Sequence, residues 1–312
     1  MAGLQEYQEA GQMLYEKLHL ASMPVAIKYI RDVAEIPETV IRPSTLGEEW
    51  SLCQAFTYAR RWSWNVAMTG NDNFCVPATG YHAWEDISDE DLTESQVRQG
   101  WHRDEEAEKR VQLYIRGLFG DAIDRREEYT GFIVSPLPKS IIVPDTVLIY
   151  GNGEQITHII QAMVYDGRNF PTSSNWGFAE SCIAGGLIPF LTQTPQIVIP
   201  GTGDRTLAGG SDSEIAIGLP GPLVLEVIAN LFKTGGRLNM GIPVRPMLAR
   251  GITSKLTPGF DFLRKNWTTA HPYNTSQPNL QASGGENERS GGYPRGRIRT
   301  HREGVAIRGR TC

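Results

Sequence analysis

Four cysteines among 312 residues are too few and too widely spaced for the disulfide framework of a small secreted protein. The chain has no run of about 18 uninterrupted apolar residues, which argues against a membrane-spanning helix. Its first ten residues lack the basic and apolar regions of a signal peptide. These absences predict a cytoplasmic protein whose cysteines are free thiols.

Motifs that would identify a reaction are missing as well. There is no Cys-x-x-Cys pair, no Gly-x-Ser-x-Gly turn, no His-Glu-x-x-His helix and no set of protein-kinase motifs. Gly151-Asn-Gly153 lacks the third glycine of a dinucleotide fingerprint, and the glycine-rich stretch 201–210 lacks the lysine of a phosphate-binding loop. Both stretches are interpreted as turns. The sequence therefore specifies no substrate, reaction type or oligomeric state.

Charge is distributed unevenly along the chain. Residues 281–312 contain seven arginines and three glutamates, a balance of +4, so residues 1–280 carry −9 of the total −5. An acidic body argues against a broad nucleic-acid-binding surface. From His271 onward, Asn, Ser, Gln, Gly, Pro and Arg dominate, which predicts a disordered basic tail at residues 271–312. The tail is interpreted as a solvated end or, alternatively, as an arm that binds nucleic acid or an acidic partner weakly.

Hydrophobic periodicity predicts an α/β or α+β fold, with a mixed β-sheet and flanking helices in one large domain of residues 1–270. The clearest unit is residues 146–164, where a continuous apolar run passes through a glycine turn into an amphipathic helix. Other helices are predicted at residues 4–18, 53–61, within 85–128 and from 220 to 232. Other strands are predicted at residues 24–30, 132–134, 141–143, 196–199 and 214–217.

The densest group of unusual side chains lies between Trp50 and Trp84, with two of the four cysteines and four of the seven tryptophans. Thiolate is the ligand type that soft iron prefers, so cysteines from three distant segments are candidate ligands of an iron–sulfur cluster that could have a redox role. The proposed metal ligands are Cys53, Cys75 and Cys182. Arg60 and Arg205 are the candidate cofactor-binding residues, because their positive charge would offset the negative charge of a cluster. The alternative is that the cysteines are small buried packing residues.

A second hypothesis concerns the aromatic side chains of the same stretch. It describes a non-catalytic binding module in which aromatic residues line an apolar pocket for a small molecule and the cysteines are structural. The pocket residues would be Trp62, Trp64, Tyr81 and Trp84. His82 is a candidate for a fourth metal ligand or a proton carrier.

Short motifs along the chain follow a recognisable order. They are Pro24-Val-Ala-Ile-Lys-Tyr, Cys53-Gln-Ala-Phe-Thr-Tyr-Ala-Arg60, Cys75 before a glycine-containing turn, Pro144-Asp145 before a strand that ends in Tyr-Gly-Asn152, and Cys182 before Gly-Asp-Arg205 and Ile-Gly-Leu-Pro220. In this order the chain resembles the uncharacterised family known as domain of unknown function 169 over roughly residues 10–235. The family has no established activity, so the resemblance implies no catalytic residues. It strengthens the three cysteines as site candidates, while the acidic segment 85–128 and the basic tail depart from the family pattern.

Overall fold

The computed structural model describes residues 2–234, 259, 262–263 and 265–266. The chain divides into two compact units, Met1–Gly259 and Phe260–Cys312. The residues described in the second unit are helical and exposed. The tail predicted at residues 271–312 lies outside the described residues, and the domain boundary predicted at residue 270 stays a prediction.

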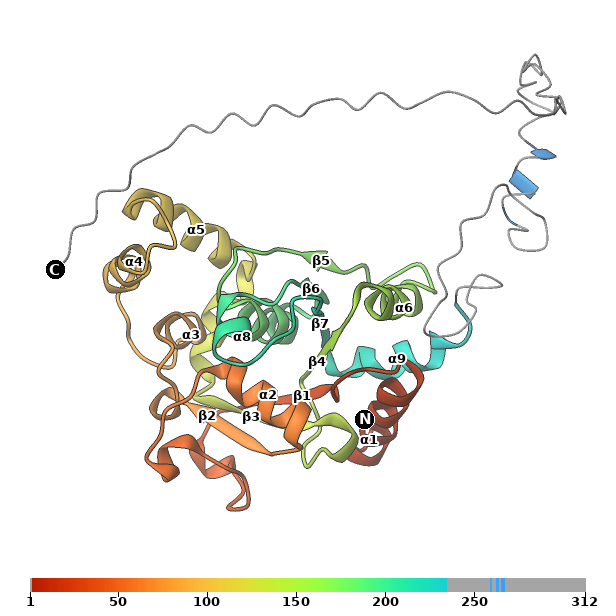
Figure 1. Ribbon diagram of the computed structural model, residues 1–312, viewed down its shortest axis with the longest axis horizontal. Coiled ribbons are helices and arrows are strands. Elements are labelled where there is room, and N and C mark those ends of the chain that lie inside the picture. Colours follow the sequence, from red (N-terminus) through yellow and green to blue (C-terminus); the bar gives the residue numbers. More distant parts are fainter. Residues whose placement is uncertain (1, 235–258, 260–261, 264, 267–312) are drawn as a thin grey trace, which may run out of the picture. The chain divides into compact units, whose positions relative to one another are not determined.

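A seven-stranded mixed sheet forms the centre of the first unit, with strand order β2-β3-β1-β4-β7-β6-β5 (Figure 1). The neighbouring strands are antiparallel except for β5 and β6, which are parallel. Helices cover the sheet, so the predicted fold class is confirmed. The strands are β1 (Val25–Ile30), β2 (Val66–Thr69), β3 (Gly131–Pro136), β4 (Thr146–Gly151), β5 (Thr172–Ser173), β6 (Gln196–Val198) and β7 (Ile215–Pro220).

Two layers of helices bury opposite faces of the sheet. Alternate residues of a strand point to opposite faces, so Leu148 and Tyr150 of β4 join one core while Val147 and Ile149 join the other. The first layer, called here the η6 layer, contains α2 (Leu52–Trp62), α3 (Val76–His82), the π-helix η6 (Glu180–Leu187) and α7 (Ile188–Thr192). The second, called the α1 layer, contains α1 (Leu4–Lys17), α6 (Gly153–Met163) and α9 (Gly221–Leu231).

Local sequence signals define the helix ends. Ser51 caps α2 by accepting a hydrogen bond from Gln54 N, while the Gln54 side chain accepts one from Ser51 N. Asn152 and Gln155 make the same reciprocal pair at α6. The remaining helices are α4 (Asp89–Arg98), α5 (Glu105–Gly117) and α8 (Thr202–Thr206), with 3-10 turns η1 (Val33–Glu35), η2 (Pro43–Leu46), η3 (Gly70–Asp72), η4 (Gly120–Glu128) and η5 (Leu137–Lys139).

The predicted strand at residues 141–143 is wrong. This segment is an irregular connection between η5 and β4, and Ile141 and Val143 are exposed. The Ser140 hydroxyl donates a hydrogen bond to the Ile142 carbonyl and accepts one from its N–H, so local bonds replace a strand ladder. Among the described helices, none is both long and apolar enough to cross a membrane.

Candidate functional site

The π-helix η6 lies within the η6 layer, and all eight of its residues are buried. It follows Ala179, a non-glycine residue with a left-handed φ of 49°. It also packs directly on β7, because a Cβ added at Gly218 would lie 2.0 Å from the carbonyl oxygen of Gly185. π-helices are rare and occur frequently at functional sites. The side chains around η6 are therefore candidates for a functional site.

Three cysteines from three distant segments lie beside η6, near enough for their charges to interact. Cys53 lies on α2, Cys75 is the N-cap residue of α3, and Cys182 lies on η6. Burial raises the pKa of each thiol, and the negative charges of Cys75 and Cys53 would raise the pKa of Cys182 further. All three are free cysteines. At neutral pH they are therefore protonated thiols that share one neighbourhood.

Asp204, which no sequence pattern singled out as a site residue, is the acidic neighbour of these thiols. It lies on the short helix α8, is buried, and raises the pKa of all three cysteines. The Tyr150 hydroxyl donates to Asp204 Oδ1 at 3.3 Å, and the Gly201 N–H donates to Oδ2 at 3.1 Å. Burial raises the pKa of Asp204. We call Cys53, Cys75, Cys182, Asp204 and Tyr150 the thiol–carboxyl site.

A second buried acid, Glu180, stands at the start of η6. Its Oε1 accepts hydrogen bonds from the backbone N–H groups of Trp176 and Gly177, while its Oε2 has no partner among the described residues. Burial raises the pKa of Glu180 to about 7, although the two backbone hydrogen bonds oppose that shift and Asp204 adds to it. The neighbourhood therefore contains a carboxyl group that changes charge near neutral pH.

Arg60 reaches this region, but its charge is already paired. Its guanidinium donates to both carboxylate oxygens of Glu214 at 2.6 and 3.0 Å, and its Cζ lies 4.0 Å from the centre of the Tyr150 ring. Such a bidentate pair fixes the side chain firmly. Arg60 thus positions Tyr150, and its role as a cofactor-binding residue stays a prediction.

Arg205 makes its hydrogen bonds away from the thiols. Its guanidinium donates to the Ser211 carbonyl at 2.9 Å and to Asp212 Oδ1 at 3.3 Å, both in its own loop. The neighbouring residue Asp204 is the one that points inward. A signal for this was present in the sequence: Gly201 and Asp204 stand at the N-cap and N3 positions of α8, where an acid binds the N-cap N–H.

The four aromatic residues of the pocket hypothesis fall into two groups. On α2 and the residues after it, Trp62 and Trp64 pack with Tyr58. In the core, Tyr81 is buried, and the Trp84 ring packs against those of His82 and Phe132. His82 is itself buried and its pKa is lowered to about 4, chiefly by that burial. It is therefore a neutral imidazole at physiological pH.

The geometry of these groups differs from that of a metal centre. Thiolate, imidazole and carboxylate are suitable donors for a soft or borderline metal. Nevertheless, within the part of the chain that the structure describes, no three His, Cys, Asp or Glu side chains are grouped closely enough to hold a metal ion. The residue types therefore fit a cysteine-ligated cofactor, whereas their spacing in this structure does not.

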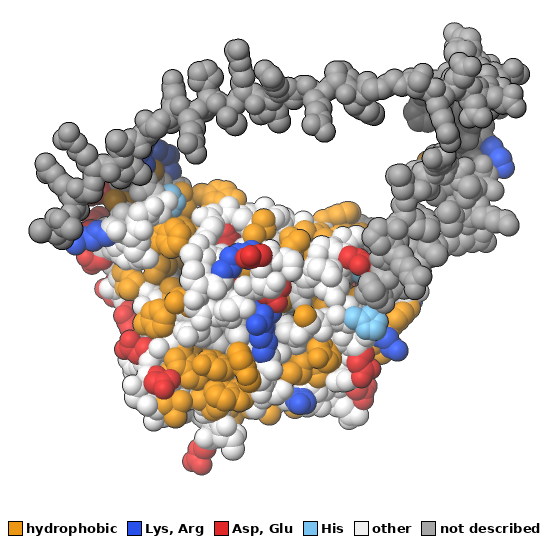
Figure 2. Space-filling model, viewed as in Figure 1, with side chains coloured by type: hydrophobic (Ala, Val, Ile, Leu, Met, Phe, Trp, Pro, Cys, Tyr) orange, Lys and Arg blue, Asp and Glu red, His pale blue; other side chains and the backbone are white. Residues whose placement is uncertain are grey.

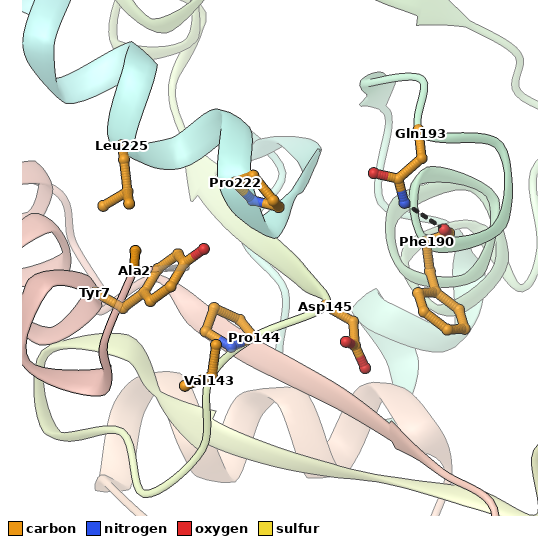
Figure 3. A pocket seen from close by; sticks show the side chains of 9 residues that line it. All are labelled: Ala2, Tyr7, Val143, Pro144, Asp145, Phe190, Gln193, Pro222 and Leu225. Carbon is orange, nitrogen blue, oxygen red and sulfur yellow. Dashed lines mark hydrogen bonds between the residues drawn. The ribbon is translucent and has the colours of Figure 1, made fainter.

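A cavity of about 430 Å³ lies elsewhere, between the α1 layer and the start of β4 (Figure 3). Most of its lining is apolar, and both oxygens of Asp145 are occupied, one by Lys28 Nζ and the other by the Tyr29 N–H. The residues that line it are Ala2, Tyr7, Val143, Pro144, Asp145, Phe190, Gln193, Pro222 and Leu225. They include none of the predicted site residues.

Fold and site together define a class of protein: a mixed α/β domain with free thiols and buried carboxyls beside a π-helix. The sequence pattern of the family described as DUF169, Uncharacterised ArCR, matches residues 13–230, and the chain belongs to this family. It is 24% identical over 227 residues to an uncharacterised protein of Methanocaldococcus jannaschii, covering 72% of this chain and 92% of that protein. No solved structure matches the chain. These comparisons identify the family and its extent.

Proposed function

We propose that this protein binds a small ligand or cofactor at the thiol–carboxyl site. The observation that carries the proposal is the convergence of three free thiols and the buried Asp204, from four distant segments, beside η6. A layer that served packing alone would favour apolar side chains here, because buried ionisable groups destabilise a fold unless something pairs with them. Both oxygens of Asp204 already accept hydrogen bonds, so a bound molecule would chiefly contact the thiols.

Unpartnered polar atoms near η6 support the same proposal. The Tyr29 hydroxyl is buried, lies close to η6 at Gly186 and has no hydrogen-bond partner among the described residues. Glu180 Oε2 is also buried and has no hydrogen-bond partner among the described residues. A buried polar atom without a partner costs about 1–3 kcal/mol. A ligand that both donates and accepts hydrogen bonds would recover this energy on binding.

A cysteine-ligated metal or iron–sulfur cofactor with a redox role is the second candidate. The donor type favours it, because three thiols are a set that soft metals prefer. Binding would have to displace three thiol protons and bring the sulfurs closer together than they lie in this structure. That requirement ranks it below a small organic ligand.

Native mass spectrometry of the full-length protein tests both candidates in one measurement. Freshly and anaerobically purified protein is expected to carry a bound mass, and that mass distinguishes an organic molecule from a metal or cluster. Cys182→Ser and Asp204→Asn are each expected to lose it. Cys312→Ser and Asp86→Asn are the matched controls, and Asp86 is exposed. Iron and acid-labile sulfide are assayed in parallel.

The outcomes separate clearly when circular dichroism shows that every variant is folded. An organic mass that depends on Cys182 and Asp204 supports the ligand proposal, and an iron-containing mass supports the second candidate. The proposed thiol–carboxyl site would be contradicted by a protein without any bound mass. It would also be contradicted if the bound mass survived in a variant that combines Cys53→Ser, Cys75→Ser, Cys182→Ser and Asp204→Asn. The cysteines would then be packing residues.

A further inference from the structure

A second cavity, of about 260 Å³, lies between α2 and the residues that follow α8. Its lining includes Tyr58, Arg61 and Trp62 from α2, and Leu207, Ala208 and Gly209 from the other side. The Thr57 hydroxyl donates to the Ala208 carbonyl at 3.0 Å, which fixes the distance between the two sides. The walls of the cavity are therefore held in place by the fold.

Two aromatic residues of α2, Tyr58 and Trp62, line this cavity and belong to a larger cluster of rings. The Tyr58 ring lies nearly parallel to that of Trp64, 6° between planes and 4.8 Å between centroids, and also contacts the rings of Trp50 and Trp62. Trp62 is 56% exposed, and Leu207 on the other side is 45% exposed. Figure 2 shows hydrophobic side chains gathered on the face where α2 lies. Exposed apolar surface that borders a cavity is typical of a binding site.

Arg61 brings positive charge to the same cavity. Its Nη2 lies 3.5 Å from Glu214 Oε1, an oxygen that already accepts a hydrogen bond from Arg60 at 2.6 Å. One carboxylate therefore serves two guanidinium groups, and the pair of arginines keeps a net positive charge. About a third of the Arg61 side chain is exposed, so its guanidinium can reach a ligand. A guanidinium in this situation is well suited to bind a carboxylate.

From these features we propose that the cavity between α2 and α8 binds a small aromatic carboxylate. Its ring would pack against Trp62 and Tyr58, and its carboxylate would pair with Arg61. The volume lies just below the range of roughly 300–1,000 Å³ typical of pockets for drug-sized ligands, which favours an occupant of one ring system. This site is distinct from the thiol–carboxyl site, because its lining residues include none of the five residues of that site.

Benzoate is the probe for the test, titrated into the full-length protein and followed by saturation-transfer NMR and by calorimetry. Cyclohexanecarboxylate keeps the charge without the aromatic ring, and benzyl alcohol keeps the ring without the charge. Benzoate is expected to bind at least tenfold more tightly than either compound. Trp62→Ala and Arg61→Gln are each expected to weaken benzoate binding at least tenfold, with Arg61→Gln also reducing its salt dependence.

Trp101→Ala serves as the matched control, because Trp101 is a similarly exposed tryptophan between α4 and α5 and does not line this cavity. It is expected to leave benzoate binding unchanged, as is Cys182→Ser, which alters the thiol–carboxyl site alone. The proposal is overturned if benzoate does not bind, if both cavity variants bind it like the wild type, or if Trp101→Ala weakens binding as much as Trp62→Ala does.

Discussion

The α1 layer and the η6 layer cover the same sheet with different kinds of residue. The α1 layer uses regular helices whose buried side chains are largely apolar, such as Leu14, Ile159 and Val227. The η6 layer contains a π-helix, three free thiols and the buried acid Glu180, and the buried Asp204 of α8 lies near it. Apolar burial stabilises a fold, whereas buried ionisable groups reduce its stability. The difference indicates that the α1 layer serves packing alone, whereas the η6 layer combines a large apolar core with groups suited to chemistry.

The largest expected effect is in the α1 layer. Ile159 of α6 is fully buried, so Ile159→Ala should lower the free energy of unfolding by about 2–5 kcal/mol through lost burial and a residual cavity. Urea denaturation followed by circular dichroism measures this change. Ile199→Ala is the control, since Ile199 is 55% exposed and should change stability by no more than about 0.5 kcal/mol. Equal effects from the two variants would contradict the inference that Ile159 is a core packing residue of this layer.

In the η6 layer, by contrast, we expect a substitution that raises the free energy of unfolding. Because the pKa of Glu180 rises from 4.5 to about 7 on folding, the folded state retains a proton that the unfolded state loses. The resulting stability is fully present below pH 4.5 and is lost as the pH rises through about 7. Glu180→Gln imitates the protonated acid at every pH, so it should be more stable than the wild type at pH 8 by up to roughly 3 kcal/mol.

Unfolding curves from pH 4 to pH 8 measure this effect. Wild type and Glu180→Gln should have similar stability at pH 4 and diverge as the pH rises. For Glu94→Gln, at an exposed position of α4, the plot of stability against pH should run parallel to that of the wild type. Parallel curves for Glu180→Gln and the wild type would show that Glu180 ionises normally and that the contrast between the layers is smaller than we infer.

The smallest expected effect concerns thiol reactivity. In a Cys312→Ser background, iodoacetamide at pH 8 should label Cys53, Cys75 and Cys182 at least roughly tenfold more slowly in the folded protein than in guanidinium, because burial raises each thiol pKa. Mass spectrometry after timed quenching gives the three rates. Rapid labelling of any one of them in the folded protein would identify a reactive thiolate and change the chemistry expected of the site.

Much of the architecture follows from patterns close together in the sequence. Residues 146–164 form β4 and α6 as predicted, because an apolar run and a three-four spacing each reflect local backbone geometry. The strand predicted at residues 141–143 shows the limit of this approach, since a β-branched run alone does not provide a neighbour to pair with. The short strand β2, the helix α8 and the π-helix η6 were likewise not predicted as such.

The sequence by itself determined the class of fold, the helix caps at Ser51 and Asn152, and the candidate cysteines, because these depend on residue type and on neighbours within one or two turns. The tertiary structure decided which side chains meet. Asp204 and Arg205 are adjacent, yet only Asp204 faces the thiols, since consecutive residues of a helix point in different directions. The contact of Gly218 with Gly185, which seats η6 on the sheet, joins residues that no local pattern links.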